Sequence, residues 1–160
     1  MYTQLSILTF IMVFSFGACA SEFTIGLAVW SGYPDSIKGF KDGLASEGLV
    51  EGENLRFIQG EVGADKKLQL GVAEKFKTEK VHLVYSLTTP GTVIVKAVMP
   101  ETTPIVFSIV TYPADSGLIE SFEYSGNNLV GTSNYIPLRH YINLLKTILP
   151  MTKEVAVFHR

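Results

Sequence analysis

The sequence predicts an α/β fold with a doubly wound parallel sheet, and two observations lead to this prediction. Short apolar runs begin near residues 23, 54, 81, 104, 129 and 154, and most of them are continuous rather than alternating, which is typical of strands covered on both faces. Stretches with helical spacing lie between these runs. Because strand and helix alternate along the chain, we expect parallel strands joined by crossover helices.

The first half of the chain contains two strand-helix pairs. The run FTIGLAVW is followed by a predicted helix whose stripe is Ile37, Phe40 and Leu44, and Gly48 is placed to end that helix. The run NLRFIQG is followed by a second predicted helix, which Asp65 caps and whose stripe is Leu68, Val72 and Phe76.

The second half is less regular. After VHLVYSL, the stretch TTPGTVIVKAVMP is predicted to be a short helix only because its position requires one, with Thr89 as N-cap and Pro90 in the first turn. After PIVFSIV we expect an irregular helix turn followed by a loop over PADSGLIESFEYSGNN. After LVGTS, a helix begins near Pro137, and EVAVF is a sixth predicted strand.

Composition and charge exclude several classes of protein. Of the 160 residues, 47% are apolar, which is enough for a folded core, and the formal net charge is −2. Without a basic run, we expect neither nucleic acid nor an anionic membrane surface as a partner. The single cysteine, Cys19, excludes an internal disulfide framework.

The first twenty residues are predicted to be a secretory signal peptide. Residues 1–20 carry no charged side chain, and an apolar stretch over 5–16 is followed by small residues up to Ala20, where cleavage is expected. Two alternatives remain open: Cys19 bears a lipid, as in a bacterial lipobox, or the leader stays as an uncleaved anchor. All three place the rest of the chain in the periplasm or another extracytoplasmic space.

The candidate binding residues follow the predicted strands. In open parallel sheets, ligands bind beyond the carboxyl ends of the strands. Rings and neutral hydrogen-bonding groups gather there, as a small polar or aromatic solute requires. They are Trp30, Ser31, Tyr33, Ser86, Thr88, Thr89, Thr111, Tyr112, Ser133, Asn134 and Tyr135.

Several of these residues also have a purely structural interpretation. Thr89 is placed to cap a helix, and Trp30 could pack under a loop. Tyr112 precedes a proline in a turn, and Asn134 is placed to cap the helix near Pro137.

Motifs for catalysis and cofactors are absent from the sequence. It has no G-x-G-x-x-G after the first strand, so no dinucleotide cofactor is expected, and it has no P-loop, G-x-S-x-G or H-E-x-x-H. His82, His140 and His159 have no partner at metal-ligand spacing, so no metal is expected. An enzyme on a flavodoxin-like sheet stays a weaker hypothesis, with Asp35 and Asp115 as the carboxylates to watch.

Four stretches, taken in order along the chain, carry a family resemblance: FKDGLASEGLVEGENL, EKVHLVYSLTTP, TPIVFSIVTYPADSGLIESFEYSGNNLVGTSN and LLKTILPMTKEVAVFHR. Together they resemble the extracytoplasmic solute-binding proteins of ABC transporters, and in particular the ABC-type periplasmic component with a type I periplasmic-binding fold. The resemblance runs from about Ile25 to the C-terminus. It implies flavodoxin-like strand order and two lobes that close on a solute, which in some members is an aromatic amino acid. By position it implies seven ligand-binding residues: Trp30, Thr88, Thr89, Thr111, Tyr112, Ser133 and Asn134.

The chain departs from the family pattern at two of these positions. Tyr112 and Asn134 stand where the family often has Asp. A carboxylate is the natural partner of a ligand ammonium. The two departures therefore leave the identity of the solute open.

The resemblance also implies a domain division and partners. Residues 21–136 are expected to form the N-terminal lobe, and residues 137–160 the crossover helix and first strand of an incomplete second lobe. The sequence is then either a fragment of a two-lobe protein or a reduced form of one, and both alternatives stay open. The expected function is non-catalytic solute binding for a membrane permease of an ABC importer, and the alternative is a sensor module of the same fold. The apolar stripe of the last helix is expected to be exposed and to promote self-association.

Overall fold

A computed structural model describes residues 23–156 and shows a five-stranded sheet. The strands are β1 (Phe23–Ala28), β2 (Leu55–Gln59), β3 (Leu83–Leu87), β4 (Ile105–Val110) and β5 (Leu129–Ser133). All neighbouring pairs are parallel, in the order β2-β1-β3-β4-β5. The predicted parallel sheet with flavodoxin-like strand order is therefore confirmed.

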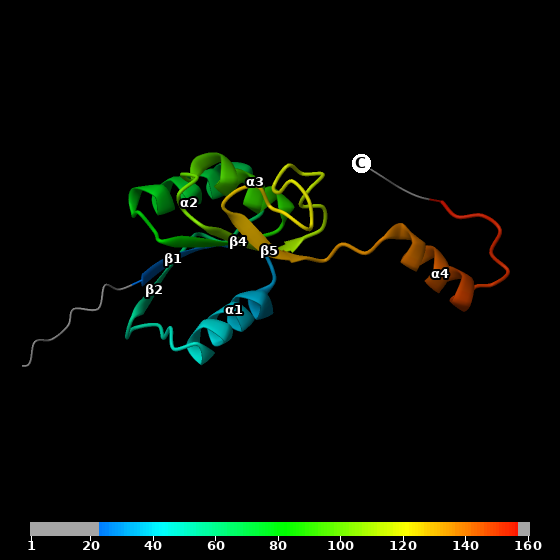
Figure 1. Cartoon of the computed structure of the whole chain (residues 1–160), viewed down its shortest axis with the longest axis horizontal. Coiled ribbons are helices and arrows are strands. Elements are labelled where there is room, and N and C mark those ends of the chain that lie inside the picture. The colour runs from blue at the N-terminus through cyan, green and yellow to red at the C-terminus, as the bar shows by residue number, and fades with distance from the viewer. Residues whose placement is uncertain (1–22, 157–160) are drawn as a thin grey trace, which may run out of the picture.

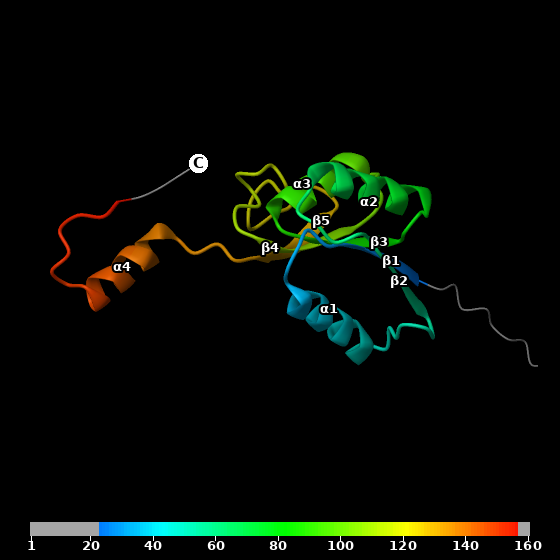
Figure 2. The same cartoon turned by 180° about the vertical axis from the view of Figure 1, so that it is seen from behind.

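The four described helices are α1 (Pro34–Ser46), α2 (Lys66–Thr78), α3 (Thr89–Val98) and α4 (Leu138–Ile148). Three of them lie over the faces of the sheet, as a doubly wound fold requires, and the last one, α4, extends away from it (Figures 1 and 2). Figures 1 and 2 show α2 and α3 together over one face and α1 over the other. The segment between β4 and β5 forms turns without a helix. The predicted loop is therefore confirmed, while the predicted helix turn is wrong.

The helix ends confirm two predicted caps and correct two others. The Asp65 carboxylate accepts a hydrogen bond from the Leu68 N–H at 2.8 Å, and Gly48 has a φ of 84° just after α1. Thr89 is not the cap of α3: Thr88 occupies that position, and its side chain makes no capping bond. Asn134 does not cap α4, which is preceded directly by Pro137.

The core is densest where the helices cross β1 and β3. Phe76 of α2 is fully buried, and its ring lies 2.8 Å from the position that a Cβ atom at Gly26 would take. Only glycine therefore allows this contact between α2 and β1. On the opposite face, the Phe40 ring stacks on Tyr85 with centroids 4.0 Å apart, and the Tyr85 hydroxyl lies 2.9 Å from Ser36 Oγ.

The end of the sheet at β5 differs from the prediction of strands covered on both faces. Four of the five β5 residues are exposed, and Val130 is 63% exposed. The physical reason is that β5 lies at the sheet edge, and the chain after it leads α4 away from the sheet instead of over it (Figure 1).

Helix α4 has an exposed apolar stripe, as predicted. None of its residues, all within the described part of the chain, is buried, and Leu138, Tyr141 and Ile148 are all more than half exposed. Self-association through this stripe stays a prediction.

The two ends of the chain are described only in part. Residues 152–156 have no regular structure, so the part of the predicted sixth strand that is described is not a strand, while residues 157–160 lie outside the described residues. The predicted signal peptide and Cys19 lie outside them as well. Within residues 23–156, no helix combines the length and the apolar character that a membrane span needs.

Candidate functional site at the carboxyl edge of the sheet

The predicted binding residues lie along one edge of the sheet. Parallel pairing aligns Ala28 with Ser86, Leu87 with Ser108, and Val110 with Ser133. The segments that follow β1, β3, β4 and β5 therefore leave the sheet at its carboxyl edge. They form a central group after β1 and β3 and an outer group after β4 and β5.

Trp30 and Thr88 meet at the first turn of α3. A Cβ atom built at Gly91 would lie 3.5 Å from Thr88 Oγ1 and 3.6 Å from Trp30 Cε3. Both side chains therefore lie against the same glycine. Trp30 is partly exposed and Gly91 is buried, so one edge of the indole is packed while another part of it reaches solvent.

Thr88 is strained and has a buried hydroxyl without a partner. Its φ of 68° and ψ of 157° fall in a region that is essentially restricted to glycine and costs about 1–3 kcal/mol for other residues. The residue is 9% exposed, and among the described side chains its Oγ1 is the buried polar atom that lacks a hydrogen-bond partner. Such strain and such an unpaired group gather at ligand sites.

The hydroxyls next to Thr88 are structural. Ser86 Oγ lies 2.9 Å from Thr92 Oγ1, and the Thr92 hydroxyl donates to the Thr88 carbonyl at 2.7 Å. This chain of bonds fixes the first turn of α3 against β3. The N–H groups of a first helical turn have no acceptor inside the helix, so Thr89 and Gly91 provide donors beside the unpaired Thr88 hydroxyl.

Gln69 is a positioning residue that sequence reasoning missed. Its side chain is 2% exposed, and Nε2 lies 3.1 Å from the Val29 carbonyl and 2.9 Å from the Gly63 carbonyl. The amide therefore fixes the backbone directly before Trp30. The signal was available in the sequence, because Gln69 stands at helical spacing from Val72, Ala73 and Phe76 on the buried stripe of α2.

The outer group is held by turn contacts. The Ser133 hydroxyl donates to the Thr111 carbonyl at 3.1 Å and accepts from the Tyr135 N–H at 3.0 Å, so it is already engaged. The Asn134 N–H donates to the Val110 carbonyl at 3.2 Å, while its side chain is exposed. The Tyr112 and Tyr135 rings contact each other edge to face, with their centroids 5.5 Å apart.

A strained bulge precedes this outer group. The pairing of β4 with β5 shifts register between Phe107 and Val110, and Ile109 within that stretch has a φ of 58°. A β-branched residue rarely adopts this conformation, and bulges re-aim the residues that follow them. The bulge therefore sets the direction in which Thr111 and Tyr112 leave the sheet.

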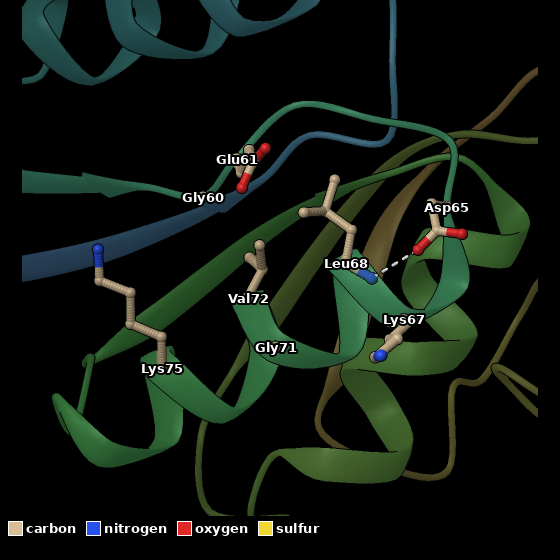
Figure 3. A pocket seen from close by; sticks show the side chains of 8 residues that line it. All are labelled: Gly60, Glu61, Asp65, Lys67, Leu68, Gly71, Val72 and Lys75. Carbon is tan, nitrogen blue, oxygen red and sulfur yellow. Dashed lines mark hydrogen bonds between the residues drawn. The ribbon is translucent and has the colours of Figure 1, made fainter.

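A separate hollow of about 590 Å³ lies beside α2, and none of the predicted binding residues lines it. Figure 3 shows Glu61 and Asp65 on the loop after β2, and Lys67 and Lys75 on α2. This lining mixes opposite charges. Across the described ranges, no three His, Cys, Asp or Glu side chains are grouped so as to hold a metal ion.

The chain is similar to known substrate-binding proteins over most of its described length. A 122-residue stretch, 76% of this chain, is 30% identical to a tyrosine-binding protein of Clostridioides difficile. The ligand-free, open structure of a substrate-binding protein with adhesive properties from Clostridium difficile matches with a TM-score of 0.73 and 26% identity over 81% of this chain. A Streptococcus pneumoniae ABC domain in complex with L-Trp matches with a TM-score of 0.69 and 25% identity over 81% of this chain.

This chain spans only part of those proteins. It covers 35% of the tyrosine-binding protein and 44% of each of the two solved structures. A sequence model of the family described as ABC transporter substrate binding protein matches residues 31–160. The parallel sheet, the residues at its carboxyl edge and this match over most of the chain agree, and the chain belongs to the ABC transporter substrate-binding protein family.

Proposed function

We propose that this chain provides the solute-contacting lobe of an extracytoplasmic ABC importer component, which binds a small amino-acid-like solute without catalysing a reaction. The observation that carries the proposal is Thr88, whose hydroxyl is buried without a partner at a strained position. A solute acceptor would satisfy this hydroxyl and the free N–H groups of the first turn of α3. A membrane permease is the proposed partner.

The solute is proposed to be an amino acid with an aromatic or polar side chain. Its carboxylate would accept hydrogen bonds from Thr88 and Thr89, and a flat side chain would stack on Trp30. The relatives that bind tyrosine and L-Trp support this class. Thr111, Tyr112, Ser133 and Asn134 would form the outer wall, where Ser133 acts through the turn that it holds.

The substitution Thr88→Val tests this proposal with opposite effects on binding and stability. Valine keeps the shape of threonine and removes only the unpaired hydroxyl. We expect the dissociation constant for L-Tyr to rise about tenfold and the melting temperature to stay or rise. Trp30 is the single tryptophan of the chain, so its fluorescence, excited at the long-wavelength edge of its absorption, reports on the site in a titration with L-Tyr. Calorimetry with L-Tyr and L-Trp measures the affinity.

The matched control is Thr102→Val, which makes the same chemical change at an exposed turn between α3 and β4. It should leave both the affinity and the fluorescence response unchanged. A wild-type chain that is folded yet shows no heat with either amino acid, and no change of Trp30 fluorescence with L-Tyr, would contradict the proposal. So would a Thr88→Val variant that melts earlier and binds normally, because the hydroxyl would then be structural.

A further inference from the structure

A second hollow lies at the outer end of the carboxyl edge, away from Thr88. Its volume is about 410 Å³, and it lies between the loop after β4 and Tyr135, two residues after the end of β5. Three aromatic rings pack around it: Tyr135 contacts Tyr112 at 5.5 Å and Phe122 at 5.7 Å between centroids. All three side chains are at least 40% exposed, so their faces are available to a ligand.

Three carboxylates, together with Ala114 and Ser121, complete this lining. Asp115, Glu120 and Glu123 line the hollow, and no lysine, arginine or histidine is among its described lining residues. A nearby cation, Lys96, is engaged elsewhere, because its Nζ donates to the Gly117 carbonyl at 2.6 Å. The described lining therefore carries three carboxylates and no cationic side chain.

The loop that carries these groups is internally bonded. The Glu120 N–H donates to the Ser125 carbonyl at 3.0 Å, and the Ser121 N–H donates to the Tyr124 carbonyl at 2.9 Å. Ser121 Oγ in turn accepts from the Glu123 N–H at 3.1 Å. These bonds order the backbone that carries Glu120, Phe122 and Glu123 before a ligand arrives, which lowers the entropy cost of binding.

We propose that this aromatic and acidic hollow, lined by Tyr112, Asp115, Glu120, Phe122, Glu123 and Tyr135, binds an organic cation, meaning an ammonium or guanidinium group on a small apolar body. The negative faces of the rings attract such a cation, and the carboxylates complement its charge. Because the rings are apolar, a bare metal ion fits this lining less well than an alkylated ammonium. The site shares Tyr112 with the outer wall proposed for the solute, and its other lining residues are not among those proposed to contact the solute.

Choline and its neutral isostere 3,3-dimethylbutan-1-ol test the charge requirement. Each is titrated into the full chain at constant ionic strength, and the tyrosine and phenylalanine ring signals are followed by NMR. We expect choline to shift the ring signals of Tyr112, Phe122 and Tyr135, with an affinity at least about fivefold higher than that of the isostere. Equal affinity for the two probes, or no shift of these rings with choline, would overturn the proposal.

The double variant Glu120→Gln with Glu123→Gln tests the contribution of the carboxylates. It should weaken choline binding about fivefold. The control double variant Glu47→Gln with Glu74→Gln removes the same charge from two exposed positions, one directly after α1 and one on α2, and should leave choline binding unchanged. Equal weakening in both pairs would mean that only net charge attracts the probe. Thr88→Val should not alter choline binding, which separates a failure here from a failure of the proposed solute site.

Discussion

Strands β3 and β5 have the same length, and both pair with their neighbours in parallel, yet β3 is buried and β5 is exposed. Four of the five residues of β3 are buried, whereas four of the five residues of β5 are exposed. The strand β3 is paired on both sides, while β5 ends the sheet, is paired only with β4, and is followed by a helix that leads away from it (Figure 1). An edge position alone does not expose a strand, because β2 at the other edge buries Leu55 and Ile58. Burial in this protein therefore depends on which elements cover the faces of a strand.

The same contrast separates the two parts of the carboxyl edge. Beside β3, Thr88 is buried, and its backbone N–H donates a hydrogen bond of 3.0 Å to the Ser108 carbonyl. Beside β5, Tyr135 is 40% exposed and contacts other exposed rings. The central group is therefore buried and tied to the sheet, and the outer group has exposed aromatic side chains.

The largest expected effect compares the centre of the fold with α4. Phe76→Ala should lower the free energy of unfolding by about 3–5 kcal/mol, because it leaves a cavity between α2 and β1. Leu144→Ala on α4, where the side chain is 56% exposed, should change it by less than about 0.5 kcal/mol. Urea denaturation followed by circular dichroism measures both, and a comparable loss in the two variants would refute the contrast.

A smaller effect comes from making one substitution in both strands. Val84→Thr in β3 buries a hydroxyl at a fully buried position and should destabilise the fold by about 1–3 kcal/mol. Val130→Thr in β5 places the hydroxyl in solvent and should be neutral to within about 0.5 kcal/mol. Thermal melts of the two variants provide the measurement. If Val130→Thr proved as costly as Val84→Thr, β5 would be covered in solution.

The smallest expected effect concerns an ion pair on α1. The hydrogen bond from Lys38 to the Asp42 carboxylate, together with the charge of Asp42, raises the pKa of Lys38 above its usual 10.5, and Asp35 adds to this while slight desolvation opposes it. A raised lysine pKa stabilises the fold below the unfolded pKa, and this stabilisation is lost as the pH rises through the folded pKa. Asp42→Asn should therefore melt slightly earlier than wild type at neutral pH.

The pH dependence is the check on this ion pair. The difference in melting temperature between wild type and Asp42→Asn should shrink above about pH 10.5. The control Glu74→Gln removes an exposed carboxylate on α2 and should show no such trend. A difference between wild type and Asp42→Asn that persists undiminished at high pH would mean that Lys38 is not its source.

Much of the fold could be predicted from local patterns, and the failures have a common cause. The stripe of Ile37, Phe40 and Leu44 and the cap at Asp65 depend on neighbours along the chain, and the structure shows both. The cap at Thr89 was misplaced by one residue because Thr88 takes a backbone conformation that sequence preferences disfavour. The exposure of β5 could not be predicted from its own apolar residues.

By itself, the sequence determined the alternation of strands and helices and therefore the parallel α/β class, because hydrophobic periodicity is a property of neighbouring residues. It also indicated that rings and hydroxyls follow the strands. Only the tertiary structure decided that the Thr88 hydroxyl is unpaired, that Gln69 fixes the backbone before Trp30, and that three carboxylates lie beside three rings near β5. These features depend on contacts between segments far apart in the chain, which local patterns do not encode.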